Sequence, residues 1–128
     1  MMSPKVWIQV LQAEFRYGVL LIADAESKED IPSWESAEEQ VAVAASALVV
    51  RAQHADEGEV TVRVCNSLAD AAGGLIFTGE IEVPSGVLRV SDALGTSAAD
   101  IKVEPGLLAI QIYADSHVEA SALHLVLT

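Results

Sequence analysis

Residues 59–65 read Glu-Val-Thr-Val-Arg-Val-Cys, so valines alternate with polar or charged side chains along this segment. Successive side chains of a β-strand point to opposite faces, and such alternation is typical of a strand that buries one face. Residues 75–83 show a similar alternation, with three apolar residues opposite three polar ones: Phe77, Ile81 and Val83 against Thr78, Glu80 and Glu82. The two segments are therefore predicted to be half-buried strands.

Turn signals separate these strands from further short apolar runs. Pro-Ser-Gly occupies 84–86, and Glu-Pro-Gly at 104–106 places proline and glycine at the two centres of a type II turn. Strand and turn alternate at spacings of roughly ten residues, and no helix-length segment separates most of the strands. The sequence therefore predicts a mainly β fold, an antiparallel β-sandwich, and a single domain over residues 1–128.

One short helix is expected near residues 33–44. Ser33 can cap its start, and Ser36 with Glu39 three positions later matches the Ser-x-x-Glu capping pattern. Acidic side chains in its first turns favour the positive end of the helix dipole. β-branched residues return at Val41, so the helix is expected to end within 41–45.

The charge balance restricts the kind of partner. Nineteen acidic residues face seven basic ones, for a net charge of −12. Nucleic-acid binding draws its affinity from Lys and Arg, and anionic membranes attract the same residues, so neither partner is expected. A basic protein partner remains compatible, because opposite fields accelerate its approach. The alternative is that the acidity only keeps the domain in solution.

Residue types that would mark a cofactor, metal or export signal are few. Cys65 is the only cysteine, which rules out an internal disulfide and a cysteine-based zinc site. We expect it to be a small buried hydrophobe, with a catalytic thiol as the alternative. Residues 1–5 lack an export pattern and no apolar run reaches membrane-spanning length, so the cytoplasm is the expected compartment. No cofactor is expected.

Catalytic patterns are equally weak. The sequence contains no phosphate-binding glycine loop, no Gly-x-Ser-x-Gly elbow and no closely spaced histidine pair. His124 alternates with leucines and is expected on the outer side of a strand. Asp115 and His117, together with an acidic loop, form the one alternative small-ligand or enzymatic site, provided that they converge in a pocket. We therefore predict no enzyme activity, no catalytic residues and no metal site.

Acidic residues are concentrated between positions 24 and 39. This segment holds seven acids and one base, Lys28, which is half of the net negative charge. A calcium site is a weaker interpretation, because the EF-hand order of ligands is missing. Trp34 is either a core residue or an aromatic anchor among the acids. The predicted partner-binding surface, gathered on one outward face, consists of Asp24, Glu26, Glu29, Asp30, Trp34, Glu35, Glu38 and Glu39.

The order of several features matches a known bacterial family. These features are Gln-Ala-Glu-Phe at 12–15, Pro-Ser-Trp-Glu at 32–35, strands at 47–53 and 59–65, and turns at 82–86 and 103–106. In them the chain resembles the competence protein J (ComJ-like) family, whose namesake inhibits a DNA-entry nuclease. Residues 123–128 depart from the pattern, because they lack the tryptophan of relatives. The resemblance implies a β-sandwich that blocks an enzyme by protein contact.

These observations lead to one main functional hypothesis. The protein is predicted to be a binding module, an acidic inhibitor or immunity protein that occludes a basic nuclease or toxin. The alternatives are a self-associating homodimeric domain and a small-ligand-binding domain. The mean hydropathy of +0.38 is compatible with a sheet face that is covered in a homodimer.

Overall fold

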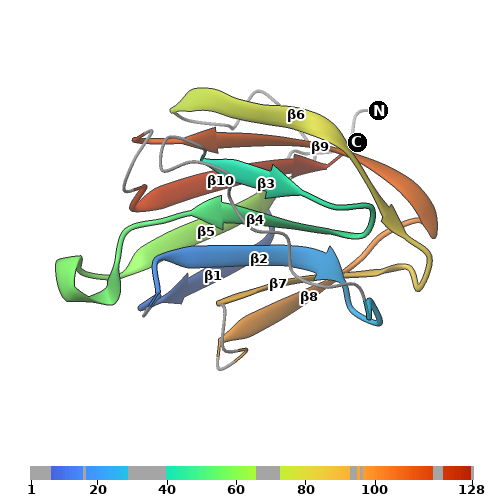
Figure 1. The fold of residues 1–128 in the computed structure, drawn as a ribbon, viewed down its shortest axis with the longest axis horizontal. Coiled ribbons are helices and arrows are strands. Elements are labelled where there is room, and N and C mark those ends of the chain that lie inside the picture. The colour runs from blue at the N-terminus through green and yellow to red at the C-terminus, as the bar shows by residue number, and fades with distance from the viewer. Residues whose placement is uncertain are drawn as a thin grey trace.

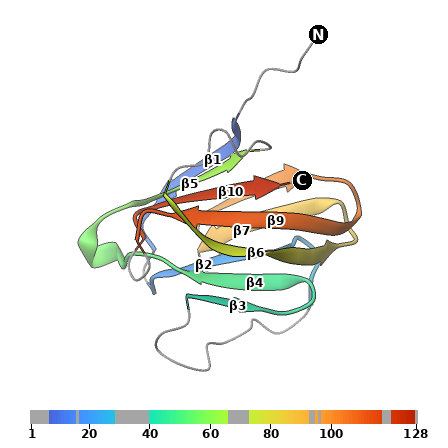
Figure 2. The ribbon, with the colours of Figure 1, turned by 90° about the horizontal axis from the view of Figure 1, so that it is seen from above.

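A computed structural model describes residues 7–15, 17–28, 40–65, 73–92, 95, 97–116 and 120–127. Within these residues, strands form two five-stranded sheets that pack face to face (Figures 1 and 2). Sheet A has the order β1 (Trp7–Ala13), β5 (Val60–Cys65), β10 (Ala122–Leu127), β9 (Gly106–Ala114) and β6 (Gly74–Val83). Sheet B has the order β3 (Val41–Val43), β4 (Ala47–Arg51), β2 (Val19–Asp24), β7 (Val87–Asp92) and β8 (Ala98–Lys102).

The predicted fold class, a mainly β sandwich, is confirmed. Antiparallel pairing connects all neighbouring strands of the two sheets except β5 and β10, which run parallel with Leu123 opposite Val62. Parallel neighbours need a long connection between them, and here more than fifty residues of chain separate the two strands. Neighbours this far apart along the chain left no signal in the local pattern.

The core lies between the two sheets and follows the predicted alternation. The valines of β5 at positions 60, 62 and 64 are buried in it, while Thr61 and Arg63 point to the opposite face. Sheet B contributes Leu20 and Ile22 from β2 in the same way. Burial of these aliphatic side chains is the main stabilising contribution, at roughly 25 cal/mol for each Å² of apolar surface removed from water.

The segment predicted as a helix is described only at its end. Residues 33–39 lie outside the described part of the chain, and Val41–Val43 form strand β3, which pairs with β4. β-Branched side chains fit the pleated surface of a sheet better than a helix, so the end of the segment is a strand. A short 3-10 turn, η1 (Ala55–Glu57), lies between β4 and β5, and the His54 side chain caps it by accepting from the Asp56 amide.

The long strand β6 runs from one end of the sandwich to the other. Its first residue, Gly74, pairs with Ala114, and its last, Val83, pairs with Gly106. We call the two ends the Asp24 end, after the last residue of β2, and the Asp115 end, after the residue that follows β9. Ten residues of strand span roughly 30 Å, so the two ends are far apart. The described part of the chain contains no helix with the length and apolar character of a membrane-spanning segment.

Candidate functional site

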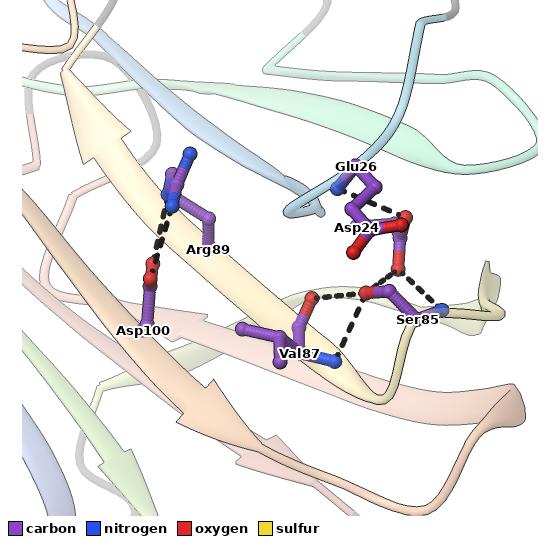
Figure 3. Close-up of polar contacts among 6 residues, drawn as sticks. All are labelled: Asp24, Glu26, Ser85, Val87, Arg89 and Asp100. Atoms are coloured by element: carbon purple, nitrogen blue, oxygen red, sulfur yellow. Dashed lines mark hydrogen bonds and ion pairs between the residues drawn. The ribbon is translucent and has the colours of Figure 1, made fainter.

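Asp24, the first residue of the predicted acidic surface, is buried at the Asp24 end with 4% of its surface exposed. Its Oδ1 accepts hydrogen bonds from the Ser85 amide at 3.0 Å and from the Ser85 hydroxyl at 2.5 Å (Figure 3). Its Oδ2 accepts from the Glu26 amide at 3.1 Å. A buried carboxylate requires such donors, because an unpaired one is costly to remove from water. The Asp24 carboxyl is therefore engaged within the fold and is not one of the outward-facing acids of the predicted surface.

The Asp24 contacts join three connections of the chain. Backbone hydrogen bonds run from the Asp24 amide to the Ser46 carbonyl at 3.1 Å and from the Ala25 amide to the Val87 carbonyl at 2.8 Å. The hydroxyls of Ser27 and Ser46 lie 2.8 Å apart. The β2 exit, the β3–β4 turn and the β6–β7 turn are thus held together. Sequence reasoning missed this role, because Asp24 and Ser85 are 61 positions apart and carry no joint signal.

The other residues of the predicted surface are placed only in part. Glu26 is exposed beside the Asp24 joint, as a contact surface requires. The remaining six lie outside the described residues: Glu29, Asp30, Trp34, Glu35, Glu38 and Glu39. Other exposed acids of the described chain occur at both ends and along β6, including Asp56, Glu80 and Glu104. The described part of the chain therefore spreads its negative charge over several faces.

A small cavity of about 260 Å³ lies beside the Asp24 joint on the outer face of sheet B. Its apolar lining comes from Leu21, Ala23, Ala25 and Ala47, and its polar lining from Asp24, Ser27 and Arg89. Ligand pockets usually measure about 300–1,000 Å³, so this cavity is small for a ligand. Its geometry adds no support to the small-ligand alternative.

The cation of this cavity is engaged by a neighbour. Arg89 Nε donates to Asp100 Oδ1 at 2.8 Å and Nη2 donates to Oδ2 at 3.0 Å across the β7–β8 pair (Figure 3). These hydrogen bonds raise the pKa of Arg89 and lower the pKa of Asp100. A bidentate pair of this kind fixes the guanidinium plane, so both charges are satisfied within the sheet.

Asp115 closes the connection between β9 and β10. Its Oδ1 accepts from the amides of Ser121 at 2.9 Å and Ala122 at 3.2 Å, and its Oδ2 accepts from the Ser121 hydroxyl at 2.5 Å. Desolvation raises the pKa of Asp115, but these hydrogen bonds outweigh it, so the pKa lies below the ordinary carboxyl value. His117, its suggested companion, lies outside the described residues.

The alternative catalytic site requires Asp115 to meet the acidic loop, of which the structure describes Asp24 and Glu26. Asp115 follows the end of β9 that pairs with Gly74, whereas Asp24 contacts Ser85 beyond the other end of β6. The intervening strand spans roughly 30 Å. Asp24 and Asp115 therefore do not share a site. Three other members of the alternative site, His117, Glu29 and Asp30, lie outside the described residues, so that site stays a prediction.

Replacing Asp115 with asparagine is expected to reduce stability in a pH-dependent way. The folded-state pKa is depressed, so the carboxylate stabilises the fold above its unfolded-state pKa and loses this effect as pH falls through the folded-state pKa. At neutral pH the variant should lose about 1 kcal/mol, the size of a net hydrogen-bond contribution at an exposed site. Urea unfolding of both proteins at neutral and acidic pH measures this difference. An equal loss at both pH values would contradict the assignment.

Two further residues of interest are both buried. Cys65 has no exposed surface, in agreement with the prediction of a small buried hydrophobe. His124 alternates with the core residues Leu123 and Leu125, so it lies on the outer face of sheet A as predicted, yet it is only 6% exposed. It is therefore not a solvent-facing strand residue. Among the residues that the structure describes, no group of three His, Cys, Asp or Glu side chains is arranged to hold a metal ion.

The arrangement of two five-stranded sheets, with its ends closed by buried or hydrogen-bonded carboxylates, defines a two-sheet β-sandwich protein. Its structure is similar to that of ComJ from Bacillus subtilis, described as an inhibitor of the DNA-degrading activity of NucA. The TM-score is 0.74 and the identity 12%, and 98% of each chain is covered. It is also similar to the product of crocagin biosynthetic gene J, with a TM-score of 0.56, 16% identity, and 98% of this chain and 97% of the other covered.

Comparison at the level of sequence finds no further similar protein. The chain matches no protein-family profile and no curated protein. At such low identities, the likeness to solved structures shows a common fold, and the predicted ComJ-like fold is thereby confirmed.

Proposed function

We propose that residues 1–128 act as one cytoplasmic binding domain that inhibits a basic nuclease by protein contact. The observation that carries this proposal is the likeness to ComJ over 98% of both chains, since ComJ is described as a nuclease inhibitor. The net charge of −12 supports it independently. A nuclease presents cationic groups to DNA phosphates, and an acidic protein competes for those groups.

The mechanism proposed is occlusion. Long-range attraction brings the acidic protein to the cationic cleft, and short-range contacts keep it there. Glu26 is the described member of the predicted contact surface that is exposed, and the proposal extends to the acids at 29, 30, 35, 38 and 39, with Trp34 as the apolar contact. Asp24 is left out because its carboxylate is used within the fold.

Inhibition of DNA degradation is the expected result. Cleavage of plasmid DNA by NucA, the nuclease named for the similar structure, should slow when the protein is added at low ionic strength. Because screening shortens electrostatic interactions to about 10 Å at 0.1 M salt and to about 3 Å at 1 M, the inhibition should weaken as salt rises. Gel assays of cleavage over a salt series measure both effects.

Poly-glutamate at equal total charge is the control for charge alone. If it inhibits as strongly as the folded protein, occlusion by a specific surface is contradicted. Unchanged cleavage at every salt concentration would contradict the inhibitor proposal itself.

A further inference from the structure

Strand β6 is an edge of sheet A, and part of that edge is open. Among the described residues, its only strand neighbour in the sheet is β9. Near its end the Glu82 amide donates to the Ala45 carbonyl of the β3–β4 turn at 2.8 Å, so the Glu82 backbone faces away from β9. Backbone groups of alternate residues point to the same side of a strand, and Thr78 and Glu80 therefore also face away from β9.

These two residues carry the backbone groups that a further strand requires. Within the described chain, no hydrogen bond links the outward backbone groups of Thr78 or Glu80 to another residue, and both residues are exposed. Each offers one amide donor and one carbonyl acceptor. An edge of this kind is a template for an added strand.

The side chains along this edge are acidic on one face. Ile81 and Val83 point into the core, so Glu80 and Glu82 lie on the outer face of sheet A. Their partners across the β6–β9 pair are Ala109 and Leu107, which carry no charge. Neither carboxylate is in an ion pair within the described part of the chain.

Exposed leucines lie on the same face near both ends of this edge. Leu107 is 64% exposed directly beside Glu82, and Leu75 is 48% exposed beside Tyr113. An added strand would pair with β6, so its side chains on this face would lie beside Thr78 and the glutamates, with Leu75 towards one end and Leu107 one strand further away on β9. A segment with lysine or arginine at alternate positions and apolar residues elsewhere is complementary to it.

A second copy of the chain does not fit this edge. Two β6 edges paired about a two-fold axis would place Glu80 and Glu82 of both copies at neighbouring positions on one face. Like charges this close are destabilising, and each copy carries a net charge of −12. The charge that prevents self-pairing favours a cationic strand.

We propose that the β6 edge at Thr78–Glu80 binds an extended basic segment of the partner by strand addition. This inference rests on the proposed function, because it names the element by which the inhibited protein is held. It makes Thr78 and Glu80 the backbone contacts, and Glu80 and Glu82 the side-chain contacts for lysine or arginine.

Amide hydrogen exchange with a synthetic peptide tests the proposal without a nuclease. The probe is a peptide of about eight residues that alternates lysine and valine, and its control replaces each lysine by glutamate. In the free protein, the amides of Thr78 and Glu80 should exchange quickly and those of Gly79 and Ile81 slowly. The lysine peptide should slow exchange at Thr78 and Glu80 at least about tenfold, and the glutamate peptide should leave it unchanged.

A charge variant separates this edge from general attraction. Glu80→Lys should weaken peptide binding about tenfold, whereas Glu104→Lys, with the same charge change at an exposed turn, should weaken it by less than about twofold. Thr78→Pro removes one outward donor at a position where an edge strand tolerates proline, and it should also weaken binding.

Three outcomes would overturn the inference. In the first, exchange at Thr78 and Glu80 stays fast with the lysine peptide bound. In the second, the two charge variants weaken binding equally. In the third, the same amides become protected in the free protein as its concentration rises, which would identify a second copy as the occupant. These outcomes can be distinguished from a failure of the proposed function. If Glu80→Lys still inhibits NucA, the edge contact is contradicted and the proposed inhibition stands.

Discussion

Replacing Phe15 with alanine is expected to lower the free energy of unfolding by about 3–5 kcal/mol, the usual cost of truncating a buried phenylalanine. Phe15 has no exposed surface and packs in the core from the connection between β1 and β2. Its carbonyl accepts from the amides of Gly18 at 2.9 Å and Ala55 at 3.0 Å, which holds the backbone in place after truncation. The ring volume would therefore remain as a cavity that the backbone cannot close.

Urea unfolding measures this loss, and Tyr17→Ala is the matched control. Tyr17 is an aromatic residue two positions away with 64% of its surface exposed, so its truncation should change stability by no more than about 0.5 kcal/mol. Similar losses for the two variants would show that Phe15 does not anchor the core. A change in the denaturant slope would instead report a change in the unfolded or native state.

Replacing Asp24 with alanine has the second largest expected effect, a loss of about 3 kcal/mol. The change leaves the Ser85 amide and the Glu26 amide without their acceptor in a partly buried place, while the Ser85 hydroxyl keeps only the longer contact of 3.3 Å to the Val87 carbonyl. Unpaired buried donors cost about 1–3 kcal/mol each, and water entering the space recovers part of it. Thermal unfolding should show the loss as a lower Tm.

Two variants separate the Asp24 carboxylate from its surroundings. Glu26→Ala keeps the backbone amide and removes only an exposed side chain, so its stability should change by no more than about 0.5 kcal/mol. Asp24→Asn keeps one oxygen acceptor for Ser85 and presents a donor to the Glu26 amide, so its loss should be intermediate. A wild-type Tm in Asp24→Ala would refute the role of this joint.

Strand β5 and Asp24 illustrate what the local sequence pattern predicts and what it does not. The alternation in residues 59–65 was sufficient to predict a strand and its buried face, and the structure confirms both. The acidity of residues 24–39 was also plain, yet it did not reveal that Asp24 turns inward to Ser85. Composition predicts the average position of a carboxylate, but the donors that bury one come from another part of the chain.

The site proposed on β6 shows the same limit. Glu80 and Glu82 were predicted on the polar face of a strand, and they lie there. Whether this strand is central or at an edge depends on which strands pair with it, and that information is absent from residues 75–83 themselves. The open backbone of Thr78 and Glu80 appears only once the pairing is known, which gives β6 the one neighbour β9 in the described part of its sheet.

Strand periodicity, turn chemistry and net charge are local or additive properties, so the chain alone was sufficient for a mainly β sandwich with an acidic surface. Three other features depend on contacts between distant segments. They are the parallel pairing of β10 with β5, the burial of Asp24 and His124, and the separation of roughly 30 Å between the Asp24 and Asp115 ends. Tertiary packing decided them, because strand pairing selects among many partners of similar local preference.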